Sequence, residues 1–459
     1  MQAERGTSGP PDLPGAAPQS GGVPGAPLRL RGAVVGLALI AALAWLVPWL
    51  SFRIPRLTGS GSMVAWGQVP SGPFIMLVVV AWVLRPLLNL GRRRRWLPSD
   101  GLLAYSILLP AIIFASVGGL YYIFGLTATP FYPAGSPPRW AAQVLPYLPS
   151  WLLQDGGGQP RVIMEYYEGA PGAMLPQVPW GAWLPLLLRW GVFLMLYYYT
   201  LLALTGLFRR RWFREEHITF PLAELALTVG GVRSSWDPRG NLLKNKLLWL
   251  GFAIPFLHAG LIMAHGYVPT VPDLSFKQIL PAAWPKGRPW DAVWPVVFFR
   301  WLVMGIAYVL PAQVSAGVLF FYFLNMAQTL VLASVGYASQ GPGGSANTVG
   351  QNQGLGGALI FAIFFFWNGR HDRAKMWRDL TGLSRPPEGP PHPDRWALPG
   401  AAAGTVGLIL WSHAAGLPWH TAGLFIVALL ALQLCTARIA AALGMPHTTF
   451  GDGPSGLLR

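Results

Sequence analysis

The sequence predicts an all-α protein that crosses a membrane about ten times, with both chain ends in the cytoplasm. Three observations lead to this prediction: 53% of the 459 residues are hydrophobic, only 11% are charged, and long apolar runs alternate with short basic segments. Soluble domains carry roughly a quarter charged residues. The net charge of +16 lies between the apolar runs, which is the pattern of membrane topology. The lipid bilayer is therefore the expected partner, and no nucleic-acid partner is expected.

Ten segments of the chain are predicted to span the membrane. A transmembrane helix needs roughly 20 mostly apolar residues to cross the hydrocarbon core. Tryptophan and tyrosine lie at many of the segment ends, as expected for side chains at the membrane interface. The predicted spans are 33–51, 72–90, 101–125, 182–207, 245–265, 293–310, 314–336, 354–369, 396–415 and 419–443.

The distribution of Lys and Arg predicts the orientation. With both ends inside, 22 of the 33 Lys and Arg residues lie in cytoplasmic segments and 7 lie in outer loops. Cytoplasmic loops carry the basic excess in membrane proteins, and we expect a multi-pass protein of the bacterial inner membrane. The predicted organisation is a disordered cytoplasmic tail over 1–32, a transmembrane domain over 33–446 with an outer loop at 126–181 and cytoplasmic loops at 91–100, 208–244 and 370–395, and a cytoplasmic tail over 447–459.

The outer loop, residues 126–181, is long, aromatic and rich in proline. Aromatic side chains favour the membrane interface, so short interfacial helices are expected there. The loop either packs on the membrane surface or forms a cap over a substrate path. The sequence leaves both interpretations open.

Ionisable residues inside predicted spans are the first candidates for function, because charge at membrane depth is costly. Among 17 acidic residues, Glu224 is the one expected near membrane depth, which disfavours a proton relay of buried carboxylates. Arg189 and Arg300 lie well inside their spans, where they either face a polar cavity or an anionic substrate, or else extend to water or pair with a neighbouring helix. Arg85 and Arg438 lie near cytoplasmic span ends, where a long side chain can extend to water.

Polar amides form a second group of candidate lining residues. Asn325 and Gln328 are three residues apart and therefore share a helix face, where they line a solute path or bond a neighbouring helix. Segment 337–357 is uncharged and rich in Gly, Asn and Gln, which predicts a loop before the eighth span. That loop either lines a cavity or is a flexible external connection. Its candidate lining residues are Asn347, Gln351 and Asn352.

The sequence predicts no metal and no cofactor, and it favours a protein that is not an enzyme. Cys435 is the single cysteine, so a multi-cysteine metal site within the chain is excluded. His258 and His413 lie in spans without readable ligand spacing, and hydrogen-bonded core histidines are expected. The chain lacks a nucleophile elbow, a His-Glu-x-x-His motif and a nucleotide fingerprint.

Residues 209–225, RRRWFREEHITFPLAEL, combine a basic anchor with the start of a short helix. The arginines hold the end of the preceding span in the cytoplasm, and Glu215 and Glu216 are expected to pair with them. Pro221 suits the first turn of a helix, with Thr219 or a neighbour as its cap. Glu224 then lies near that first turn, where the helix dipole favours a carboxylate. This helix is too short to span the membrane.

The same stretch resembles a segment of a family of multi-span bacterial membrane proteins of unknown function. Members carry a basic-Trp-acidic run followed by Leu/Ile-x-Phe-Pro-Leu. The family in turn resembles oligopeptide-transporter-like proteins, in which a Phe-Pro or Tyr-Pro step opens a short helix near the transport path. That resemblance implies such a role for Phe220 and Pro221. Further motifs in the family's order are LPSWLLQD (148–155), EYYEG (165–169), PWGAWLPLLLRW (179–190), NKLLWLGFA (245–253) and TARIAAALGMP (436–446).

The chain departs from this family in two respects. Ala440 and Ala442 stand where members usually carry Arg and Glu, so an ion pair there is expected to be lost. Members usually continue with further spans after the position of Pro446, so the chain is expected to be a truncated or split form. The leading prediction is a permease for a small polar or peptide-like solute. The alternatives are a scaffold subunit that binds a partner subunit or a second copy, and an enzyme acting on a lipid-linked substrate in the outer loop.

Overall fold

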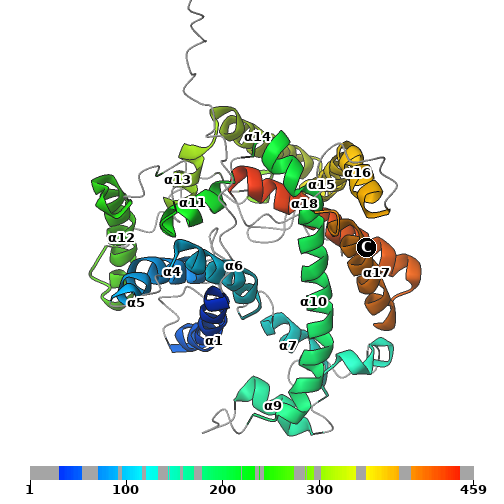
Figure 1. Cartoon of the computed structure of the whole chain (residues 1–459). Helices are drawn as coiled ribbons and strands as arrows, with labels where there is room; N and C mark the ends of the chain where they lie inside the picture. Colours follow the sequence, from blue (N-terminus) through cyan, green and yellow to red (C-terminus); the bar gives the residue numbers. More distant parts are fainter. Residues whose placement is uncertain are drawn as a thin grey trace, which may run out of the picture.

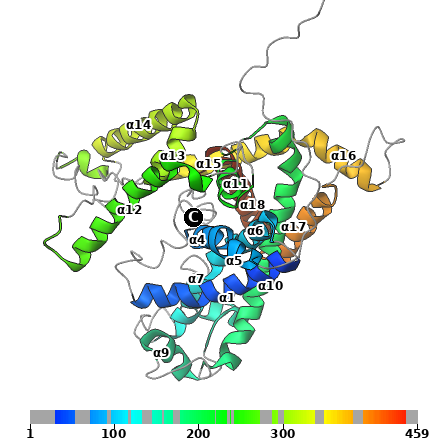
Figure 2. The ribbon, with the colours of Figure 1, turned by 60° about the vertical axis from the view of Figure 1, so that its left-hand side comes forward.

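The structure is a computed structural model, and the residues that it describes form helices, turns and short extended pieces without any β-strand. The predicted all-α class is therefore confirmed for this part of the chain. Figures 1 and 2 show the arrangement from two sides. The described residues are 30–53, 71–90, 96–115, 120–132, 143, 145–155, 159–169, 178–218, 220–232, 237, 242–272, 285, 287–293, 301–336, 348–381 and 394–444.

The first helical pair is α1 (Leu30–Arg53), which packs along α6 (Pro98–Ala115). Two glycines one turn apart make this close approach possible. A Cβ atom at Gly32 would lie 2.7 Å from the backbone oxygen of Asp100, and Gly36 is similarly tight. Small residues at this spacing are typical of helix contacts in membranes, because they let two backbones approach.

The predicted span 72–90 is helical but not uniform. It consists of α4 (Ser71–Val79), a π-helical turn (Val80–Leu84) and α5 (Arg85–Asn89). Pro86 follows the π turn and has no amide hydrogen for a helical bond, which accounts for the change of geometry. α4 packs against α6 and extends the first group.

Short helices occur in the described parts of the segment predicted as an outer loop. They include the end of α7 (Leu120–Ala128), a 3-10 turn (Ser150–Leu152) and α9 (Pro160–Glu168). Buried side chains of α7 and α9 pack around Trp183. The prediction of short helices within 126–181 is therefore confirmed for the described residues.

The central group is built on α10 (Trp180–Arg210), which runs along α17 (Ala397–Ala414) (Figure 1). α18 (Trp419–Leu443) packs on both, α15 (Thr348–Asn368) packs on α18, and α16 (Arg370–Thr381) follows α15. Leu, Ile, Ala and aromatic side chains at helical spacing form the core of this group. Its buried members on α10, α17 and α18 are Ala203, Leu204, Leu207, Phe208, Ala401, Leu408, Ile426, Leu430 and Leu434.

The remaining helices are α11 (Pro221–Val229), α12 (Lys246–Tyr267), α13 (Trp301–Val309) and α14 (Ala312–Ser334). α11 packs between α4 and α18 and so connects the first group with the central group. α12, α13 and α14 lie to one side, away from α17, in both views (Figures 1 and 2). Many large apolar side chains of α12 and α14 are exposed.

Four helical segments in the described part of the chain are long and apolar enough to cross a membrane: Trp180–Phe213, Lys246–His265, Ala312–Ser334 and Trp419–Leu443. Such segments suggest a multi-pass membrane protein, because a helix of about 20 apolar residues matches the hydrocarbon thickness. Each of the four coincides with one predicted span.

The structure does not display ten spans. Every predicted span contains helix, but the range 101–125 holds two helices, α6 and α7, and residues 116–119 lie outside the described part. α10 runs across the direction of α4 and α6, so the described helices do not form one parallel bundle (Figure 1). Apolar length alone predicted the helices, whereas their direction depends on tertiary contacts that the sequence pattern does not encode.

Candidate functional site

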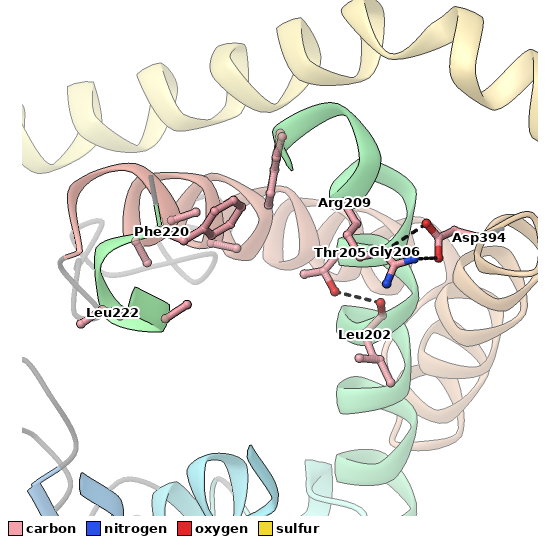
Figure 3. Close-up of a pocket in the computed structure, with 12 residues that line it drawn as sticks. Leu202, Thr205, Gly206, Arg209, Phe220, Leu222 and Asp394 are labelled. Carbon is pink, nitrogen blue, oxygen red and sulfur yellow. Dashed lines mark hydrogen bonds and ion pairs between the residues drawn. The ribbon is translucent and has the colours of Figure 1, made fainter. Parts of the chain in front are cut away.

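A pocket of about 590 Å³ lies at the end of α10, where α10, α11 and α18 meet (Figure 3). This volume is in the range of small-ligand sites, roughly 300–1,000 Å³. Its charged lining residues are Arg209 and Asp394, and most of the wall is apolar. The other lining residues are Leu202, Thr205, Gly206, Trp212, Phe220, Leu222, Ala223, Ala437, Ala440 and Ala441.

An ion pair forms one side of this pocket (Figure 3). Arg209 donates from Nε to Asp394 Oδ2 at 3.2 Å and from Nη2 to Oδ1 at 2.7 Å. Two parallel bonds of this kind fix both side chains in one geometry. The Arg209 side chain is 66% exposed and that of Asp394 is 16% exposed, so the pair contributes little to stability. The Arg209 guanidinium is therefore accessible to a solute, whereas the Asp394 carboxylate is largely covered.

Phe220 faces the pocket from the opposite side (Figure 3). Its backbone adopts the left-handed conformation, with φ 45° and ψ 60°, directly before Pro221 at the first position of α11. Left-handed backbone costs roughly 1–2 kcal/mol for a residue with a Cβ atom. Pro221 suits the first helical turn because it lacks an amide hydrogen. The sharp turn at Phe220 directs Leu222 and Ala223 of α11 into the pocket wall.

The helix start at Pro221 and the place of Glu224 in the first turn of α11 confirm the sequence prediction. The capping residue is Phe220, the neighbour of Thr219, and it makes no side-chain hydrogen bond at the helix start; Thr219 itself lies outside the described residues. The backbone oxygen of Phe220 instead accepts hydrogen bonds from the amides of Ala223 and Glu224.

A network of two arginines and one carboxylate lies behind Trp212. α10 continues as a π-helical turn over Arg211–Glu215, and Glu216 follows it. Arg211 Nε donates to Glu216 Oε1 at 2.8 Å, and Arg438 Nη2 donates to Glu216 Oε2 at 2.7 Å. The guanidinium of Arg438 also lies 5.9 Å from the ring centroid of Trp212. The expected pairing of Glu216 with an arginine is confirmed, and Arg438 pairs with it as well.

The side chain of Arg438 was expected to extend to water at the membrane surface, and this expectation is wrong. Its side chain is 19% exposed and reaches across from α18 to the end of α10. The sequence pattern places a residue on its own span, whereas the partner, 222 positions away, is set by the packing of α10 on α18.

Three buried nitrogen atoms around this network have no hydrogen-bond partner among the described residues: Trp212 Nε1, Arg438 Nε and Arg373 Nη1. Phe208 lies between Trp212 and Phe366: its ring stacks on that of Trp212, with the centroids 5.7 Å apart, and meets the Phe366 ring edge-on. The Arg373 guanidinium lies over the same Phe366 ring. Burial lowers the pKa of Arg373, and the positive charge of Arg211 lowers it further against the opposing effect of Asp372.

The predicted site residues are not all gathered at this pocket. Glu224 directly follows the lining residues Leu222 and Ala223 and is half-buried. Arg189 lies on α10 about 30 Å from Arg209, given 1.5 Å per helical residue. Its Nη1 donates to the backbone oxygen of Trp151 at 2.5 Å. Arg189 thus connects α10 to the outer segment.

The predicted amide residues lie partly in other elements than expected. Asn325 and Gln328 lie on α14 as expected, and the backbone oxygen of Asn325 accepts a hydrogen bond from Thr329. Residues 348–353 were expected in a loop but form the first turns of α15, so Gln351 and Asn352 are helical. Glycine and amide residues predicted the loop, and the apolar run that follows extends the helix backwards over them. Asn347 and Arg300 lie outside the described residues.

His258 and His413 engage in hydrogen bonds, as the sequence predicted, but both are half-buried rather than part of the core. Trp301 Nε1 donates to His258 Nδ1 at 3.2 Å, which joins α13 to α12. His413 Nδ1 lies 2.8 Å from the backbone oxygen of Leu417. Within the described part of the chain, His, Cys, Asp and Glu do not gather in any group of three that could hold a metal ion.

Sequence reasoning did not single out Asp394 or the small residues of α18 as site residues. Asp394 lies in a proline-rich stretch that was interpreted as a cytoplasmic loop. Ala440 and Ala441 line the pocket, and Ala440 is one of the two positions noted as departures from the resembled family. That departure could have indicated the pocket wall from the sequence, because a methyl group in place of an ionic side chain leaves space beside α18.

Residues 23–459 match the profile of DUF6785, described as a family of unknown function. A search of curated proteins and a search of solved structures found no match. The expected membership in an uncharacterised family is thus confirmed, and the likeness to oligopeptide-transporter-like proteins stays a prediction. Nearly the whole chain is covered, so the protein belongs to the DUF6785 family.

Proposed function

We propose that this protein is a permease of the bacterial inner membrane for a small polar or peptide-like solute. The observation that supports the proposal is the pocket of about 590 Å³ where α10 and α18, both long enough to cross a membrane, meet the short helix α11. A binding site between helices, beside an interrupted helical element, is a recurring feature of transporters. The Phe220-Pro221 step lies at this pocket, in line with the resemblance.

The proposal includes a topology of ten spans with both ends in the cytoplasm. The charge distribution supports it, because 22 of 33 Lys and Arg residues then lie inside. In this orientation Arg209 and Asp394 are at the cytoplasmic end of α10. The pocket is then an inward-facing vestibule, and transport requires a second arrangement that opens to the outside.

Uptake by purified protein in liposomes tests this proposal. A panel of labelled dipeptides is offered outside the vesicles, and accumulation above protein-free vesicles is expected. Ala441→Leu places three extra carbon atoms in the pocket wall and should reduce uptake by about tenfold or more, since overfilled sites exclude their ligands. Ala402→Leu is the matched control because Ala402 is an exposed alanine of α17.

Uptake that is equal to that of empty vesicles for every solute in the panel contradicts a permease. Equal uptake by Ala441→Leu, Ala402→Leu and the natural protein contradicts the assignment of the pocket to the solute path. Thermal unfolding of all three proteins distinguishes a blocked pocket from a misfolded chain.

A second candidate function is that of a scaffold subunit. It is favoured by α12, whose most apolar 18-residue window contains no buried residue. A span with no buried residue in this window, among the residues that the structure describes, offers its surface to a partner subunit. Purification in a mild detergent with chemical cross-linking tests this candidate, and a stoichiometric partner that contacts α12 supports it.

A further inference from the structure

We propose that the pocket between α10, α11 and α18 binds an amphipathic anion, with the apolar body of the ligand on the alanine and leucine wall and its negative group at Arg209. This inference rests on the permease proposed above and narrows its solute to one chemical class. It predicts a peptide-like molecule with a free carboxylate and without a free ammonium group.

The apolar part of the ligand follows from the wall of the pocket. Leucine, phenylalanine, tryptophan and alanine side chains supply most of the lining, and Ala437, Ala440 and Ala441 leave space along α18. Burial of apolar surface contributes roughly 25 cal/mol per Å². A fully hydrophilic solute would gain nothing from this wall, whereas a solute with one or two aliphatic side chains would.

The negative group follows from the charge balance around the pocket. Over residues 209–216, the side chains that the structure describes include three arginines and two glutamates. Arg438 and Asp394 add one charge of each sign, since both reach this region through ion pairs. The excess is positive, and the arginine at the pocket surface is Arg209. A cationic solute would meet net repulsion there.

The hydrogen-bonding groups near the pocket also favour an anionic ligand. The three buried atoms around Trp212 that have no hydrogen-bond partner in the described part of the chain are all nitrogen donors, and two of them belong to guanidinium groups. A surplus of donors is complemented by acceptors, and carboxylate or phosphate oxygens are the strongest acceptors for arginine. Trp212 itself lines the pocket, and the guanidinium of Arg438 lies 5.9 Å from its ring centroid.

The Arg209–Asp394 ion pair gives the proposal its sharpest test. Asp394 occupies the guanidinium that an anionic ligand would need, so the ligand carboxylate has to compete with it. Removal of Asp394 should therefore strengthen binding of an anion, whereas it should weaken binding of a zwitterion that uses both charges. If the ion pair only held the fold, Arg209→Gln and Asp394→Asn would change the affinity for the anion in the same direction.

Four forms of one dipeptide separate the ligand charges at constant apolar surface. The ligands are N-acetyl-dileucine (anion), dileucine amide (cation), N-acetyl-dileucine amide (neutral) and free dileucine (zwitterion). Calorimetric titration uses the full-length protein in phosphatidylcholine nanodiscs. The anion is expected to bind about tenfold more tightly than the neutral form, as for one hydrogen-bonded charge pair, and the cation most weakly.

Three variants complete the test. Arg209→Gln should weaken binding of the anion by about tenfold, and Asp394→Asn should strengthen it by about threefold, the size of an exposed ion pair. Arg378→Gln is the matched control, because Arg378 is an exposed arginine of α16 that bonds within its own helix and does not line the pocket. It should leave the dissociation constant unchanged.

Tightest binding of the zwitterion or the cation overturns the proposal, and so does weaker anion binding by Asp394→Asn. Nanodiscs that contain phosphatidylglycerol test for a lipid headgroup: loss of anion binding there assigns the pocket to a lipid and overturns a soluble ligand. Anion binding without uptake in liposomes would contradict the permease alone. Uptake of a cationic or neutral dipeptide, without preference for the anion, would contradict this inference alone.

Discussion

Glu216 balances two arginines that come from different parts of the chain. It lies where the π-helical turn after α10 ends, and its two carboxylate oxygens accept hydrogen bonds from Arg211 and Arg438. All three side chains are less than one quarter exposed. The repulsion between two guanidinium groups in such surroundings is screened poorly, so this carboxylate holds α18 against the end of α10.

Glu216→Gln should lower the free energy of unfolding by about 1–3 kcal/mol, because two partly buried guanidinium groups lose their counter-charge. Thermal unfolding in detergent measures the change. Glu215→Gln is the control, since Glu215 is exposed. We expect a change below about 0.5 kcal/mol for this surface position. Equal losses for the two variants would show that the network does not stabilise the fold.

His217, like Phe220, has a left-handed backbone conformation, and this conformation can be tested by substitution. It is exposed, and its φ of 47° lies in the left-handed region that favours glycine. His217→Gly should raise or preserve the midpoint of thermal unfolding. His217→Val should lower stability by about 1–2 kcal/mol, because a β-branched side chain is strained in this conformation. A valine variant as stable as the glycine variant would contradict the left-handed turn.

At the level of elements, the contact between α10 and α17 depends on small residues of α17. Gly404 packs on Thr200, which is fully buried, and a Cβ atom at Gly404 would lie 3.1 Å from the Thr200 Cβ. A Cβ atom at Gly400 would lie 2.8 Å from the Tyr199 hydroxyl. The backbone of α17 therefore packs directly on side chains of α10, and small residues that allow such close approach are common for helices in membranes.

Gly404→Ala should destabilise the protein by about 1–3 kcal/mol, because the added methyl group overlaps Thr200. The same substitution at Gly191 of α10 should raise stability by up to about 1 kcal/mol, since alanine favours helix and a Cβ there meets nothing within 4 Å. Thermal unfolding of both variants compares a packed with an open glycine on the same pair of helices. A stabilising Gly404→Ala would refute the close contact.

The helices themselves were largely predictable, because apolar length and proline position are local signals. The start of α11 at Pro221 is one example, and the coincidence of α18 with the predicted span 419–443 is another. The start of α15 at Thr348 was not predicted, since Gly and Asn favour loops by themselves. The pocket was only half predictable: Phe220 was singled out by motif, but Asp394 reaches Arg209 across 185 residues. Such a contact depends on packing rather than on local pattern.

At the scale of the whole molecule, labelling of introduced cysteines can distinguish the outer from the cytoplasmic side in the proposed topology. Cys435 is buried and 2% exposed, so the natural protein should react little with a maleimide that does not cross membranes. The proposed topology has Arg161 outside and Arg378 in the cytoplasm. Both arginines are exposed in the structure.

Arg161→Cys should therefore be labelled in intact cells, and Arg378→Cys should be labelled after the membrane is permeabilised. A mass shift on a gel measures both reactions, and the natural protein reports the background from Cys435. Labelling of Arg378→Cys in intact cells would contradict the cytoplasmic placement of segment 370–395. Protection of Arg161→Cys would contradict the outer placement of 126–181.

α10 is 31 residues long and extends about 46 Å at 1.5 Å per residue. One end is fixed to the outer segment through Arg189 and Trp151, and the other carries Arg209 at the pocket. A tilt of α10 by about 10° at Arg189 would displace Arg209 by roughly 5 Å, because the two residues are about 30 Å apart along the helix. A small rearrangement of the outer segment would thus be enough to separate Arg209 from Asp394.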